Sequence, residues 1–188
     1  MPSPKVFVIL VNWNGDNDTL TCLESLRQVR YDAMHVVISD NGSRPQSVDS
    51  IRRWLVMNPV GVNVGGIQSC SVIENGKNLG FTGANSTGIR YALDHDADYV
   101  LFLNNDTIVT PDFLSRMIAA GEADSSVGII GCKIFYASAE PNGIHKVWSL
   151  GGYEFKNGMP INIAAEKVDR PEWSGVHEQP LINGCCML

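Results

Sequence analysis

Hydrophobic positions in the first 135 residues alternate between short apolar runs and longer stretches with helical spacing. The runs at residues 5–11, 34–39 and 99–103 are typical of strands buried on both faces of a parallel sheet. The stretches between them carry apolar residues three or four positions apart: Leu20, Leu23, Leu26 and Val29; Val48, Ile51, Trp54 and Leu55; Ile89, Ala92 and Leu93; Phe113, Leu114, Met117 and Ile118. Strands that alternate with helices predict an α/β fold with a mostly parallel central sheet.

The pattern changes in the last third of the chain. Residues 128–135 predict one further strand, after which Gly, Asn, Pro and Trp interrupt short segments such as 147–155 and 159–164. We expect small hairpins or long loops there, with residues 136–188 forming an irregular part beside a core of residues 1–135 in one domain. The chain ends within an apolar run, residues 180–188, so we expect the intact protein to continue beyond it.

Composition and charge narrow the class of protein. The 188 residues are 44% hydrophobic and 18% charged, which is typical of a globular domain. A net charge of -6 argues against a general nucleic-acid binder, which would carry a basic face. The five cysteines lack zinc-type spacing and predict reduced thiols in a cytosolic protein. For Cys185 and Cys186, two buried strand residues are favoured over a redox pair.

Polar residues follow three of the predicted strands. They are the clusters 12–14 (NWN), 40–43 (DNGS) and 104–106 (NND), which a parallel sheet would bring to one edge. A fourth cluster, 78–83 (NLGFTG), precedes a helix, where glycines let the backbone approach a ligand and free N–H groups attract an anion. Together these clusters predict a nucleotide site. The dinucleotide fingerprint and the GK[ST] phosphate loop are absent from the sequence.

The stretch 99–106 (YVLFLNND) leaves two interpretations open. Asp106 stands in a short turn between a strand and a helix, with Thr110 predicted as the helix cap and Pro111 at the first helical position. A carboxylate there is suited to a hard cation that carries a phosphate. The alternative is a helix-entry turn in which Asn and Asp satisfy backbone donors only.

Four segments in this order, VNWNG, SDNGS, NLGFTGANSTGI and LFLNNDTIVTPDFL, resemble the family 2 glycosyltransferases with the GT-A fold, in particular rhamnosyltransferase-like members. The final INGCCML is similar to the G-A-C-M-L stretch of that family. The resemblance implies a Rossmann-like, three-layer sandwich in which residues 1–135 bind the nucleotide and residues 136–188 begin the acceptor side. It implies transfer, with inversion, from a UDP- or dTDP-sugar, dTDP-rhamnose among them, to a glycan or lipid-linked acceptor.

The resemblance also implies roles for particular residues. Asp40 would accept a hydrogen bond from the pyrimidine ring. The remaining donor-site residues would be Val11 and Asn12 at the base and ribose, Asn78 and Gly80 at the ribose and diphosphate, and Asn104 and Asn105 at the ribose or sugar. Asp106, the retained carboxylate of the D-x-D motif of the family, would bind Mg²⁺ or Mn²⁺ at the diphosphate, where negative charge grows on the leaving group.

One element of the reaction is missing from the sequence. An inverting transfer needs a general base, which in this family is an Asp or Glu after the G-A-C-M-L stretch, so we expect it beyond Leu188. A non-catalytic nucleotide-sugar-binding fragment is therefore one alternative, and a nucleotidyltransferase on a related fold is another. We expect the protein in the cytoplasm, at the inner face of the cell membrane if its acceptor is lipid-linked. Peripheral membrane association and a homodimer are compatible with the sequence.

Overall fold

The computed structural model describes residues 2–61, 66–140 and 143–188. These form two compact units, Met1–Arg116 and Met117–Leu188, and each is described by itself. The boundary falls some way before residue 135, where the sequence pattern changes. The assignment of residues 1–188 to one functional domain stays a prediction.

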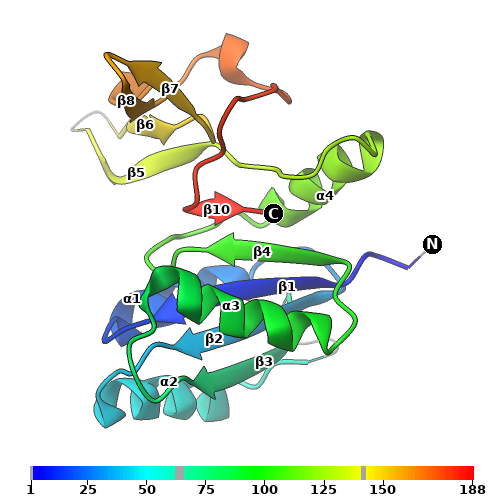
Figure 1. The fold of residues 1–188 in the computed structure, drawn as a ribbon, viewed down its shortest axis with the longest axis vertical. Helices are drawn as coiled ribbons and strands as arrows, with labels where there is room; N and C mark the ends of the chain where they lie inside the picture. The colour runs from blue at the N-terminus through cyan, green and yellow to red at the C-terminus, as the bar shows by residue number, and fades with distance from the viewer. Residues whose placement is uncertain (1, 62–65, 141–142) are drawn as a thin grey trace. The chain divides into compact units, whose positions relative to one another are not determined.

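The first unit is built on four parallel strands in the order β4-β1-β2-β3 (Figure 1). Its elements are β1 (Val6–Asn12), α1 (Asp16–Leu26), β2 (Met34–Asp40), α2 (Pro45–Met57), β3 (Ile67–Glu74), α3 (Gly80–Leu93) and β4 (Tyr99–Leu103), followed by the start of α4 (Phe113–Ala123). This arrangement confirms the predicted α/β fold with a mostly parallel central sheet. Part of the loop before β3, residues 62–65, lies outside the described residues.

Helices cover both faces of this sheet. Side chains alternate along a strand, so Phe7 and Ile9 share one face of β1 and Asn12 lies on the other. Phe7 packs with Ala92 of α3, and a Cβ atom at Gly88 of α3 would lie 2.6 Å from Cγ2 of Ile9. Asn12 instead bonds to side chains of α1 and α2. The unit is therefore a three-layer sandwich, with α3 crossing one face (Figure 1).

The strand register brings the polar strand ends together. Asn12 pairs with Asp40, and Leu10 pairs with Leu103, so the residue after Leu103 continues at the same end of the sheet. Strands β1 and β2 are buried along almost their whole length, which holds their polar ends in fixed positions. The carboxyl edge is thus a place where three loops emerge side by side.

Two local predictions differ from the structure. The predicted apolar side of α1 is confirmed for Leu23 and Leu26, and Val29 just beyond the helix is buried too, but Leu20 is only half-buried and the buried side also includes Thr19 and Cys22. The fourth helix begins at Phe113, not at the predicted Pro111. There the Phe113 N–H donates to the Thr110 carbonyl, so Thr110 closes a turn ahead of the helix.

The second unit contains short antiparallel strands, which confirms the predicted hairpins. A three-stranded sheet has the order β5-β6-β9, and β7 pairs with β8. The elements are β5 (Ile134–Ala139), β6 (His145–Ser149), β7 (Tyr153–Lys156), β8 (Met159–Asn162), β9 (Lys167–Val168), a 3-10 turn (Pro171–Trp173) and β10 (Cys186–Met187). The strand predicted over 128–135 begins only at Ile134, and Gly131 forms a single bridge with Met187.

Candidate functional site

A chain of hydrogen bonds links the three polar clusters at the carboxyl edge of the first unit. The Asn12 amide donates to Oδ1 of Asp40 at 2.8 Å. The Thr19 hydroxyl of α1 donates to Oδ1 of Asn12 at 3.2 Å, and the Asn105 amide donates to that hydroxyl at 2.9 Å. The ends of β1, β2 and β4 are therefore fixed relative to one another by side chains.

Asn12 and Asp40 form the buried centre of this chain. Asn12 is fully buried and Asp40 is 2% exposed, so neither polar group could be accommodated without partners. The second oxygen of Asp40 accepts from the backbone N–H of Ser43 at 3.0 Å. A carboxylate has about four acceptor positions, so Asp40 is oriented by these donors and retains acceptor capacity.

A second set of bonds joins the loop after β2 to the loop before α3. The Asn41 amide donates to Oδ1 of Asn78 at 2.9 Å, and its own oxygen accepts from the Leu79 N–H at 2.8 Å. Gly42 permits this approach: its φ is +77°, and a Cβ atom there would lie 2.6 Å from the carbonyl carbon of Lys77. The two loops therefore act as one surface.

The start of α3 opens onto solvent beside this surface. The Gly80 N–H donates to Oδ1 of Asn78, and Gly80 has φ +71° with open space where a Cβ atom would stand. Asn78 and Gly80 are both exposed. The first turn of a helix leaves backbone N–H groups without intrahelical acceptors, so this turn offers donors to an anion at the carboxyl edge.

The loop after β4 carries the exposed acidic group. Asp106 is exposed, Asn104 is half-buried, and the Asn104 carbonyl accepts from the Thr107 hydroxyl at 2.7 Å. Within the described ranges, no three His, Cys, Asp or Glu side chains gather in a way that could hold a metal ion. Asp106 can supply one carboxylate ligand, so a cation there would need its other ligands from a bound molecule or water.

The structure brings together most of the predicted residues and adds others. Val11 is half-buried and, like Phe7 and Ile9, lies on the α3 side of β1, opposite to Asn12. The sequence prediction gave no individual role to Thr19, Asn41, Ser43 or Arg44, which the structure adds to the network. Arg44 brings a positive charge to the β1 loop, where its Nε donates to Oδ1 of Asn14 at 3.2 Å. Only Asn41 and Ser43 had a signal, because they stand within the DNGS cluster.

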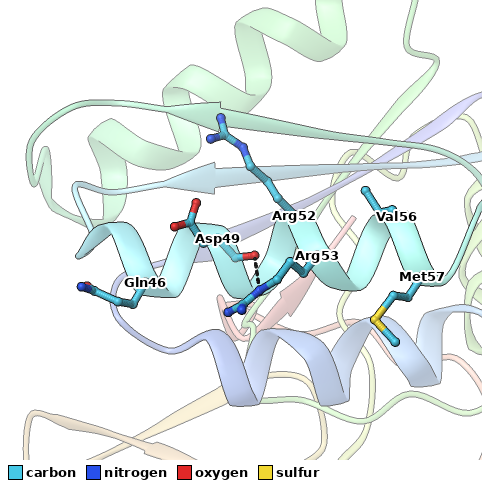
Figure 2. Close-up of a pocket in the computed structure, with 6 residues that line it drawn as sticks. All are labelled: Gln46, Asp49, Arg52, Arg53, Val56 and Met57. Carbon is cyan, nitrogen blue, oxygen red and sulfur yellow. Dashed lines mark hydrogen bonds between the residues drawn. The ribbon is translucent and has the colours of Figure 1, made fainter.

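A hollow on the surface of α2 lies outside this network. Its lining residues all belong to that helix, namely Gln46, Asp49, Arg52, Arg53, Val56 and Met57 (Figure 2). The Arg53 Nε donates to the Asp49 carbonyl, while Val56 and Met57 are largely exposed. One side of a single helix cannot enclose a nucleotide, so this hollow does not suit the predicted nucleotide site.

The fold belongs to the class of α/β domains seen in GT-A glycosyltransferases. The mannosyltransferase PcManGT of Pyrobaculum calidifontis, solved with GDP-Man and Mn²⁺, matches with a TM-score of 0.55 and 20% identity over 70% of this chain and 37% of its own. S. aureus TarS 1-349 matches with a TM-score of 0.58 and 17% identity over 72% of this chain and 37% of its own. TarS has also been solved with UDP-GlcNAc.

The chain belongs to glycosyl transferase family 2, because the model of that family matches residues 7–171. A curated relative, the putative glycosyltransferase EpsH of Bacillus subtilis (strain 168), is 26% identical over 126 residues, which are 66% of this chain and 33% of EpsH. The chain therefore spans about a third of the length of the relatives that it matches. In the described part of the chain, no helix has the length and apolar character needed to cross a membrane.

Proposed function

We propose that this chain binds a nucleoside-diphosphate sugar at the carboxyl edge of its parallel sheet, as the donor domain of an inverting glycosyltransferase. The donor would be a UDP- or dTDP-sugar, dTDP-rhamnose included, and the acceptor a glycan or lipid-linked glycan of a cell-surface polysaccharide. The observation that carries the proposal is the hydrogen-bonded chain from Asp40 through Asn12 and Thr19 to Asn105.

This series of hydrogen bonds supports the proposal because a nucleotide site needs rigid polar groups. Asp40 is held by Asn12 and Ser43, and its remaining acceptor capacity would be available to the N–H of a uracil or thymine ring. Of the two residues predicted at the base and ribose, Val11 would border them, whereas the fully buried Asn12 would act by holding Asp40 in place. The joined loops of Asn41 and Asn78 would place Gly80 and the helix start against the diphosphate.

A divalent cation, Mg²⁺ or Mn²⁺, fits this arrangement at Asp106. Its carboxylate is exposed and suited to a hard cation, and the amides of Asn104 and Asn105 border the same turn. When bound, the cation would neutralise the charge that grows on the nucleoside diphosphate as it leaves. The assignment of the general base to an Asp or Glu beyond Leu188 stays a prediction.

Calorimetry with UDP, dTDP and GDP, each with and without Mn²⁺, tests the donor site. We expect UDP or dTDP to bind, GDP to bind at least tenfold more weakly, and affinity to fall when Mn²⁺ is removed. An absence of binding by both pyrimidine diphosphates would refute the site. Tight binding of GDP would instead refute the role of Asp40.

The Asp106→Ala variant tests the cation separately. We expect it to lose the Mn²⁺-dependent part of UDP affinity, about tenfold or more, because removal of a residue that merely supports a metal ligand already costs about 10–100-fold in metal affinity. The matched control is Asp32→Ala, which removes an exposed carboxylate just before β2, at the opposite edge of the sheet. Retention of the full Mn²⁺ effect in Asp106→Ala would exclude Asp106 as the ligand.

The non-catalytic alternative predicts donor binding without turnover. Release of nucleoside diphosphate from the donor sugar in the presence of glycan acceptors, followed for this chain and for a C-terminally longer form, separates the two. Turnover that appears only in the longer form supports a donor domain in a larger enzyme. Binding with no turnover in either form favours a binding module. The nucleotidyltransferase alternative would require release of pyrophosphate from a nucleoside triphosphate.

A further inference from the structure

Two cysteines that are far apart in the sequence stand opposite each other in the second unit. Gly131 and Met187 form an antiparallel bridge, and the preceding Ile130 exchanges two backbone hydrogen bonds with Leu188, at 2.8 and 2.9 Å. Because paired antiparallel segments run in opposite directions, the residue after Gly131 lies opposite the residue before Met187. Those residues are Cys132 and Cys186.

The register of this pair is fixed by its surroundings. A second bridge joins Gly152 to Ile182, and the Asn183 N–H donates to the Gly151 carbonyl at 2.7 Å. A Cβ atom at Gly131 would lie 2.8 Å from the Gly151 oxygen and 2.9 Å from Cγ2 of Ile182. A shift in register would place a residue with a Cβ atom at the position of Gly131 and cause a clash, so Cys132 and Cys186 stay opposite each other.

The distance between such positions suits a disulfide. The antiparallel bridge between Gly131 and Met187 makes Cys132 and Cys186 the next opposed residues of the two segments. Opposed residues of antiparallel segments have Cα atoms about 4.5–5.5 Å apart, inside the range of about 4.4–6.8 Å that disulfides span.

The chemistry of the two thiols is also favourable. A hydrogen bond from the Cys186 side chain lowers the pKa of the Cys132 thiol, against the opposing effect of burial. The thiolate is the nucleophile of thiol–disulfide exchange. By contrast, burial raises the pKa of Cys70 to about 12, which keeps that thiol protonated and unreactive.

We propose that Cys132 and Cys186 form a reversible disulfide that cross-links the C-terminal strand to residues 130–132 under oxidising conditions. The Cys132 thiolate attacks one sulfur of a small disulfide such as glutathione disulfide, and one glutathione thiolate leaves. The Cys186 thiolate then attacks the sulfur of Cys132 in the mixed disulfide, and the second glutathione leaves. The two cysteines are oxidised, one disulfide of glutathione is reduced to two thiols, and the two cysteine protons end on those thiols.

The test is incubation of the protein with glutathione disulfide, followed by intact mass measurement and non-reducing peptide mapping. We expect a monomer that is lighter by about 2 Da, the mass of the two hydrogens removed. Because Cys185 and Cys186 are adjacent and share a peptide, the variants Cys185→Ser and Cys186→Ser identify the partner. The bridge to Cys132 should persist in Cys185→Ser and be lost in Cys186→Ser.

Other outcomes overturn the proposal. A bridge that survives Cys186→Ser, a bridge between Cys185 and Cys186, or glutathione adducts alone would each do so. A second measurement uses the alkylation rate of Cys132 by iodoacetamide near neutral pH, with Cys70 as the slow internal reference. Cys186→Ala should slow this reaction several-fold, because Cys132 loses the donor that stabilises its thiolate. An unchanged rate would mean that the two thiols do not interact.

Discussion

Replacement of Asn12 by alanine should destabilise the first unit more than any exposed substitution in it. The side chain is fully buried and donates to Asp40 at 2.8 Å, while its oxygen accepts from the Gly15 N–H and the Thr19 hydroxyl, each at 3.2 Å. A hydrogen bond to a charged group contributes about 1.5–3 kcal/mol and a neutral one about 1 kcal/mol. The expected loss is therefore about 4 kcal/mol.

Urea denaturation followed by circular dichroism measures this loss as a lower midpoint at an unchanged slope. The matched control is Asn17→Ala, because Asn17 is an exposed asparagine in the first turn of α1. Its unfolding free energy should stay within about 0.5 kcal/mol of the wild type. A loss of less than about 1 kcal/mol in Asn12→Ala would refute the importance of the buried chain.

The Asn12→Asp variant adds a test with almost no change in shape. It places a second carboxylate against the buried Asp40, and two like charges at that distance oppose ionisation of both. The folded variant therefore binds more protons than the unfolded chain. Its loss of stability relative to the wild type is largest at neutral pH and shrinks as pH falls. A deficit that grew on acidification would contradict this account.

Two further predictions concern His35 and Gly42. Burial, with Lys5 and His95 nearby, lowers the pKa of His35 below its usual 6.5, so the unfolded chain binds more protons and stability is lost as pH falls through 6.5. Urea midpoints between about pH 7 and pH 5 should fall less in His35→Phe than in the wild type, and equal falls would contradict the prediction. Gly42→Ala combines a φ of +77° with a backbone clash at 2.6 Å and should cost about 3 kcal/mol. Gly76→Ala, at φ +70° in open space, should cost only about 1 kcal/mol, and equal losses would contradict the role of the clash.

Much of the fold follows from local pattern. The apolar runs at β1, β2 and β4 are long enough and sufficiently uniform to indicate buried parallel strands, and the helices between them show their spacing directly. The polar clusters after these strands were also visible, because strand ends are marked by an abrupt change of residue type. Residues 128–133 were also predicted as strand because they are mostly apolar. In the structure they form only a single bridge, between Gly131 and Met187, at a position where a Cβ atom would not fit.

The candidate site was predictable only in part. The sequence indicated that Asn12, Asp40 and Asp106 would share one edge, since parallel strands end together. It gave no sign that Thr19 joins two of the clusters, because a threonine within a helix has no local feature that marks it as a buried bridge. Which polar residues are buried depends on how α1 and α2 pack on the sheet, and that packing involves residues far apart in the chain.

The sequence by itself determined the class of fold, the edge of the sheet at which the polar clusters would lie, and the family resemblance. It could do so because periodicity and motif order are properties of neighbouring residues. Only the tertiary structure decided the partners: Asn12 with Asp40, Asn41 with Asn78, and Cys132 with Cys186. These pairs are joined by strand register and loop packing across long separations. Register is set when whole faces are buried together, so no single segment encodes it.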